Sequence, residues 1–114
     1  MKKIIFTALA SLLLLSTTVF AEPHTDAALE HANAAVTHGK AGHADVLVEH
    51  AFPALEHAMA AALVCKGVAK THVDAAVTEL EAAVEHGKMN HADVATQHAE
   101  AAVTHLNAAV QAEK

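Results

Sequence analysis

The chain has 114 residues, with 13 acidic and 7 basic side chains, 11 histidines and a formal net charge of −6. This length fits one small domain, and the acidic balance excludes nucleic acid as a partner, since binding it requires a basic surface. A framework of internal disulfides is also excluded, because Cys65 is the only cysteine.

Residues 1–21 have the pattern of a secretory signal peptide. Lys2 and Lys3 precede an apolar stretch, and Val19-Phe20-Ala21 resembles a cleavage site. The stretch is too short to span a bilayer comfortably, which argues against a membrane anchor. We therefore expect a periplasmic mature domain of residues 22–114 that is not held at the membrane. The full chain has a net charge of −6 and the mature domain one of −8, because removal of the signal takes away Lys2 and Lys3 and no acidic residue.

Four helices are predicted after the signal, at about residues 24–38, 43–65, 72–86 and 91–112. Alanine, the strongest helix former, is abundant in all four. Lys66-Gly67 interrupts the helical pattern in the middle of the domain. Pro53 falls inside the second helix and is expected to kink it or to split it after Phe52.

Capping residues set the expected helix ends. Gly39 and Gly87 stand where C-terminal caps are expected. Asn90 is a favourable N-cap for the last helix, and Thr71 with Asp74 resembles a capping box for the third.

The two halves of the domain repeat one another. The segment His38-Gly39-Lys40 followed by His43-Ala44-Asp45-Val46 recurs as His86-Gly87-Lys88 followed by His91-Ala92-Asp93-Val94. Short turns join the first helix to the second and the third to the fourth, which makes these neighbours antiparallel. The sequence therefore predicts an all-α fold, an antiparallel four-helix bundle made of two repeated helical hairpins.

The histidines recur every seven residues, so they define position a of a heptad. Positions b, e and f carry mostly alanine, valine or leucine and form one apolar stripe, while positions c and g carry carboxylates. Position a lies at the edge of the apolar stripe. A histidine there can reach a neighbouring helix and still contact water.

The spacing decides which histidines can share a metal ion. Residues seven apart are separated by about 10.5 Å along a helix, too far for two metal–nitrogen bonds of about 2.0–2.1 Å each. In an antiparallel hairpin, however, residues at the same height form pairs, here called rungs: His24–His57, His31–His50, His38–His43, His72–His105, Glu79–His98 and His86–His91. The hand of each turn decides whether the members of a rung meet across their own hairpin or face the other hairpin.

These rungs predict binding of several divalent metal ions. Cu(II) has the highest intrinsic affinity for imidazole sites, with Ni(II) and Zn(II) weaker. A two-histidine site completed by water or a carboxylate binds less tightly than a closed cage, which suits buffering better than catalysis.

The run Val36-Thr37-His38-Gly39-Lys40-Ala41-Gly42-His43, together with residues 94–102, resembles the bacterial small metal-binding protein family. The resemblance extends over the whole mature chain. It implies a monomeric periplasmic four-helix bundle that binds several divalent ions, copper foremost, with a role in copper homeostasis and with the heptad histidines as ligands. Glu79, Pro53 and Cys65 depart from the family pattern.

Three other functions were considered, and two of them remain as alternatives. A di-iron enzyme requires Glu-x-x-His pairs, and no glutamate here has a histidine three residues later, so we expect no enzyme. A non-covalent bis-histidine haem site and an acid-responsive proton buffer both stay open, the latter because the histidines gain charge as the pH falls. Cys65 is interpreted as a small buried residue, with a thiolate metal ligand beside Met59 or a dimer disulfide as its alternatives.

Overall fold

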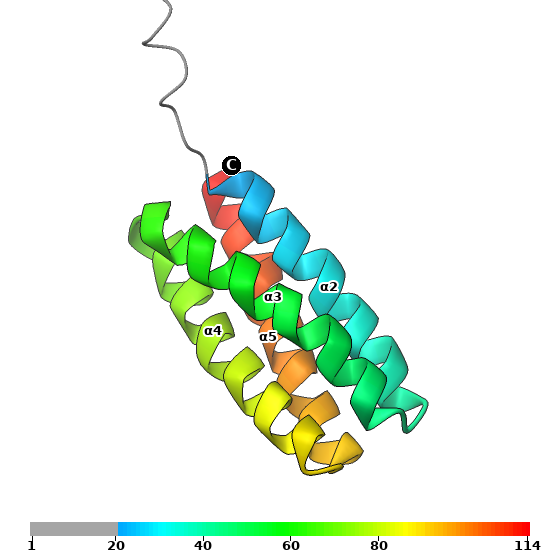
Figure 1. Cartoon of the computed structure of the whole chain (residues 1–114). Helices are drawn as coiled ribbons and strands as arrows, with labels where there is room; N and C mark the ends of the chain where they lie inside the picture. Colours follow the sequence, from blue (N-terminus) through cyan, green and yellow to red (C-terminus); the bar gives the residue numbers. More distant parts are fainter. Residues whose placement is uncertain (1–20) are drawn as a thin grey trace, which may run out of the picture.

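The structure is a computed structural model, and it describes residues 21–114. Its helices are α2 (Glu22–Lys40), α3 (Ala44–Val64), α4 (Gly67–Lys88) and α5 (Ala92–Glu113), arranged as a four-helix bundle (Figure 1). No strand occurs in residues 21–114, so the predicted all-α fold is confirmed. The predicted signal peptide lies, apart from Ala21, outside the described residues. Within the described part, no helix is both long and apolar enough to cross a membrane.

Two hairpins form the bundle, as the internal repeat predicts. α2 packs on α3 and α4 packs on α5, and the bundle closes because α3 also packs on α4 and α2 on α5. Figure 1 shows the four helices side by side, with the α2–α3 and α4–α5 turns at the same end. The start of α2, the end of α5 and the α3–α4 connection therefore share the opposite end.

The core is thin and consists mainly of alanine. Ala32, Ala35 and Ala102, at heptad positions b and e, have no exposed surface, whereas the position-f residues Val36 and Val103 are only partly buried. The apolar stripe is thus narrower than predicted. The largest fully buried apolar side chains are Leu47, Leu80, Leu106 and Val73.

α2 and α4 extend beyond their predicted ends, whereas α3 is one residue shorter at each end and α5 begins one residue later than predicted, so the capping predictions are wrong. Gly39 and Gly87 lie inside the last turns of α2 and α4, and the left-handed positions in the two hairpin turns are Gly42 (φ +84°) and Asn90 (φ 62°). Asn90 is thus a turn residue, and His91 occupies the N-cap of α5. Thr71 and Asp74 form no capping box, because α4 begins at Gly67.

Pro53 does not split the second helix. α3 is continuous from Ala44 to Val64 with Pro53 inside it. Proline removes one backbone hydrogen bond from a helix interior. Ala51 and Ala54 on either side are fully buried, so packing of this face against the bundle holds the helix together across the missing bond.

Gly39 permits α2 to approach α5 closely, which explains glycine at this helical position. A Cβ atom on Gly39 would conflict with Thr96 Oγ1 and lie 2.6 Å from Leu47 Cδ1. Overpacking a core costs about 1–3 kcal/mol, whereas replacing glycine with alanine inside a helix gains at most about 1 kcal/mol. We therefore expect Gly39→Ala to lower the free energy of unfolding, measured by urea denaturation. An unchanged or higher value would contradict this close contact between helices.

Candidate metal centre

The structure brings the two members of every predicted rung together across their own hairpin, which resolves the hand of both turns. At one end of the bundle, His24 Nδ1 lies 3.5 Å from His57 Nδ1 and His72 Nδ1 lies 3.2 Å from His105 Nδ1. The ring centroids of the other histidine pairs are separated by 6.3 Å (His31–His50), 6.4 Å (His38–His43) and 5.9 Å (His86–His91). In the remaining rung, His98 Nδ1 donates to Glu79 Oε2 at 2.9 Å.

Contacts between successive rungs join the imidazoles into a ladder on each hairpin. On α2 and α3, the ring of His57 stacks on that of His31 (5.8 Å, 8°), and the ring of His50 stacks on that of His38 (5.2 Å, 4°). We call the six histidines of α2 and α3 the first ladder. Their rings form a continuous zigzag from His24 to His43.

The second ladder, on α4 and α5, is interrupted. It consists of five histidines and Glu79: His72, Glu79, His86, His91, His98 and His105. His86 stacks on His98 with a centroid separation of 5.4 Å, which matches the stacks in the first ladder. Glu79 has no ring to stack on His105, so the chain of imidazoles stops at the Glu79–His98 rung.

The ladders lie at the edge of the bundle core, where the heptad pattern predicts. Nine histidines are partly buried, and only His43 and His91, next to the turns, are exposed. Ions can therefore reach the rungs from solvent.

The donor atoms fit a metal ion that binds imidazole. Two nitrogens at about 2.0–2.1 Å from one ion lie about 3.3 Å apart in a tetrahedral site and about 2.9 Å apart at the right angles that Cu(II) prefers. The facing Nδ1 atoms are 3.2 and 3.5 Å apart in the His72–His105 and His24–His57 rungs, so small side-chain rotations bring them to either geometry. His50 Nδ1 and His86 Nδ1 are buried without a hydrogen-bond partner. A buried imidazole nitrogen with no partner is costly, and a bound ion would remove that cost.

Each rung supplies two protein ligands and no more. Within residues 21–114, no group of three or more histidine, cysteine, aspartate or glutamate side chains is arranged to hold an ion. Water would therefore complete the coordination of an ion on a rung, which makes each site open.

The Glu79–His98 rung differs from the others in the absence of metal. Its hydrogen bond satisfies His98 Nδ1 and one Glu79 oxygen, and both side chains are largely buried. The Nδ1 atoms of the His24–His57 and His72–His105 rungs also lie within hydrogen-bonding distance. A hydrogen bond to an ionised carboxylate is about twice as strong as one between neutral groups, so an ion that uses the atoms of the Glu79–His98 rung must break a stronger bond. We therefore expect weaker copper binding here than at a two-histidine rung.

Cys65 lies at the end of the bundle opposite the two turns, and it is buried and free, as interpreted from the sequence. Burial, followed by the hydrogen bond and negative charge of Glu113, raises the pKa of the Cys65 thiol to about 11. Met59 is half-exposed on α3 and does not line the cavity beside Cys65. Sequence reasoning missed Glu113, because it lies outside the histidine heptads and meets Cys65 only in the folded bundle.

Comparison with known proteins identifies the family of this chain. A search of curated proteins gave no match. A family model described as "Small metal-binding protein" matches residues 1–109. That match covers nearly the whole chain, including both histidine ladders, and the chain belongs to the small metal-binding protein family.

Proposed function

We propose that the two ladders bind several divalent transition-metal ions, Cu(II) foremost and Ni(II) and Zn(II) more weakly, with the heptad histidines as ligands. The observation that carries this proposal is the pair of facing Nδ1 atoms, 3.2 Å apart in the His72–His105 rung and 3.5 Å apart in the His24–His57 rung. The family to which the chain belongs supports metal binding as its role.

Imidazole chemistry and the open rungs favour copper buffering over catalysis. At sites built from nitrogen ligands, Cu(II) binds more tightly than the other common divalent ions. Sites with two protein ligands exchange ions more readily than closed cages. The acidic surface also raises the local concentration of cations. Together with the signal pattern of residues 1–21, these properties support a periplasmic protein that sequesters or buffers copper without acting as an enzyme, and the family resemblance implies that it is a monomer.

In the first ladder, ring spacing argues against haem as the ligand of a rung. A bis-histidine haem places its macrocycle between two nitrogens that lie on opposite sides of the iron, about 4 Å apart at bond lengths near 2 Å. In the first ladder, successive rings stack with centroids 5.2 and 5.8 Å apart. These neighbouring rings occupy the space that the macrocycle needs.

Metal titration of the purified protein at neutral pH tests the proposal. We expect several Cu(II) ions per chain, weaker binding of Ni(II) and Zn(II), and a melting temperature that rises with free metal. A ligand at about 100 times its dissociation constant adds about 2.7 kcal/mol to folding stability for each site. Acid should release the metal, since imidazole binds as the neutral ring. A single very tight site with the other histidines silent would refute the ladders as binding sites, and absence of binding would favour the proton-buffer alternative.

A further inference from the structure

The rungs are not the only close pairs of histidines in the first ladder. The ring centroid of His57 lies 5.7 Å from that of His24 on its own rung and 5.8 Å from that of His31 on the next rung. The ring centroid of His50 lies 6.3 Å from that of His31 on its own rung and only 5.2 Å from that of His38. Each inner histidine therefore has two imidazole neighbours at similar distances. We call His31–His57 and His38–His50 the shifted pairs.

The shifted pairs have the spacing that one shared ion requires. Bonds of about 2.0–2.1 Å from one ion to two imidazole nitrogens place the ring centroids about 4.5 Å apart at a right angle and about 6.4 Å apart on a straight line. The shifted pairs, with centroids 5.8 and 5.2 Å apart, fall within this range, as do the rungs of the first ladder. Their rings lie nearly parallel, at 8° and 4°. Rotation of each ring about its Cβ–Cγ bond turns the nitrogens toward a shared ion.

His50 has a nitrogen free to serve either kind of pair. Its Nδ1 atom is buried and has no hydrogen-bond partner, whereas the Nδ1 atoms of His24 and His57 already face each other at 3.5 Å. Within residues 21–114, no group of three or more ligating side chains is arranged to hold an ion, so no third side chain fixes an ion to one rung. His50 can therefore ligate an ion together with His31 or together with His38.

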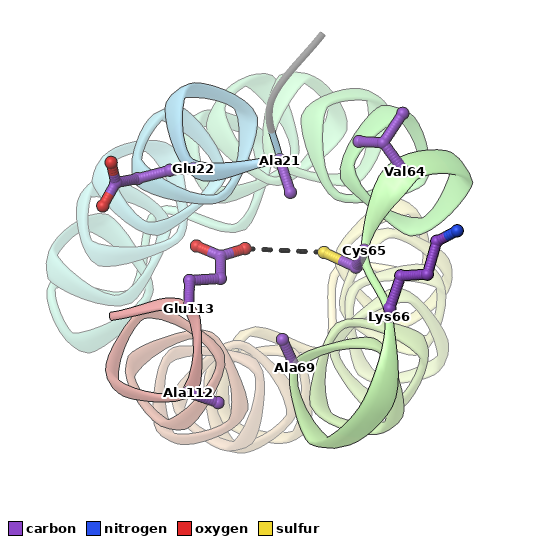
Figure 2. Close-up of a pocket in the computed structure, with 8 residues that line it drawn as sticks. All are labelled: Ala21, Glu22, Val64, Cys65, Lys66, Ala69, Ala112 and Glu113. Carbon is purple, nitrogen blue, oxygen red and sulfur yellow. Dashed lines mark hydrogen bonds between the residues drawn. The ribbon is translucent and has the colours of Figure 1, made fainter.

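The six histidines of the first ladder form a closed set. The end of the bundle opposite the turns holds a cavity of about 330 Å³, in which Cys65 and Glu113 point toward one another (Figure 2), and no histidine of residues 21–114 lines it. At the other end, the ladder stops at the exposed His43 beside the turn. The three rungs use all six histidines, whereas the two shifted pairs leave the end histidines, His24 and His43, unused. A change of pairing can therefore be detected by counting bound ions.

Glu79 removes one shifted pair from the second ladder. The internal repeat aligns Glu79 with His31 of the first ladder. The ring centroid of His105 lies 5.5 Å from that of His72 on its own rung. Glu79, which accepts a hydrogen bond from His98 at 2.9 Å, takes the place of a second imidazole neighbour of His105. The His72–His105 rung is therefore isolated, and only the first ladder is continuous.

We propose that the first ladder binds divalent ions at the shifted pairs as well as at the rungs, so that its six histidines hold ions in either of two registers. This inference rests on the copper binding proposed above. Neighbouring pairs share one histidine, so an ion passes from a rung to a shifted pair by forming a bond to one neutral imidazole and breaking the bond to another. The ion keeps its oxidation state, and no proton is transferred. The first ladder is thus a continuous track that ends at the exposed His43, whereas Glu79 confines an ion to the His72–His105 rung.

The copper stoichiometry of a double variant of the full chain tests this proposal. His24→Ala combined with His43→Ala takes one histidine from each of two rungs. Fixed rungs predict the loss of two ions, because only the His31–His50 rung stays complete. We expect the loss of only one ion, because the four remaining histidines form both shifted pairs. Chelator competition counts the ions, at a chelator concentration that removes copper from a lone histidine. The ions that remain should bind within about tenfold of the affinity of a rung, equivalent to about 1.4 kcal/mol.

His24→Ala combined with His57→Ala is the matched control, because it also removes two histidines but takes both from one rung. It should lose one ion whether or not the shifted pairs bind. Circular dichroism of each variant checks that the helices form. A loss of two ions in the first variant and of one in the control, from a wild-type protein that binds several ions, would overturn the shifted pairs and leave the proposed function intact. Absence of copper binding by the wild-type protein would overturn both.

Discussion

Replacing His72 with alanine is expected to remove one copper site from the chain, and replacing His105 as well should remove no further site. The two Nδ1 atoms face each other at 3.2 Å, so loss of either imidazole leaves a lone ligand on that rung. Groups that share a partner behave non-additively, whereas independent sites add within about 0.3–0.5 kcal/mol. Copper stoichiometry and affinity, measured by chelator competition for each single and double variant, give the result.

The control pair for this experiment lies in the same ladder but on different rungs. His72 belongs to the rung at the end of the bundle opposite the turns, whereas His91 pairs with His86 beside the α4–α5 turn. His72→Ala combined with His91→Ala should therefore cost nearly the sum of the two single losses. Additive losses for His72 with His105 would show that these histidines do not share an ion across the hairpin.

The Glu79–His98 rung permits a variant that should gain copper affinity instead of losing it, measured by the same chelator competition. Glu79→His replaces the hydrogen-bonded carboxylate with a second imidazole facing His98, and it restores the ring missing from the second ladder. Because imidazole suits copper better than carboxylate does, copper binding at this rung should strengthen. No gain in this variant would indicate that the rungs do not hold copper between paired side chains.

Leu80→Ala is expected to produce the largest loss of stability of any single change considered. Leu80 is fully buried in a core cluster composed largely of alanine, so few neighbouring side chains can fill the space left behind. Leucine-to-alanine changes in a core cost about 2–5 kcal/mol, which is a large part of the stability of a small domain. Urea denaturation of the metal-free protein measures the loss.

Leu63→Ala is the matched control, because Leu63 is 86% exposed on α3. Surface substitutions of this kind usually change stability by no more than about 0.5 kcal/mol. Copper should restore part of the stability lost in Leu80→Ala, since metal binds only when folding has brought the rung partners together. If Leu80→Ala lowered the free energy of unfolding no more than Leu63→Ala does, the buried leucines would not be a main source of the stability of this core.

The fold class and the two members of each rung follow from the amino-acid pattern alone. Alanine-rich heptads with histidine at position a place the apolar stripe and the histidine edge on each helix, and short turns make successive helices antiparallel. These are local properties, so His31 with His50, or Glu79 with His98, could be paired from residue numbers alone. The family match agrees with the metal binding inferred from that pattern.

The hand of the turns, the roles of the glycines and the contact between Cys65 and Glu113 depend on how the four helices pack together. Both hands of a hairpin satisfy the same heptad pattern, and packing of four helices around one core selects between them. Gly39 resembles a cap in the sequence, but the approach of Thr96 on α5 explains why it is glycine. Cys65 and Glu113 are 48 residues apart in the chain, and no periodic signal connects them. Their contact arises because the α3–α4 connection and the end of α5 close the same end of the bundle.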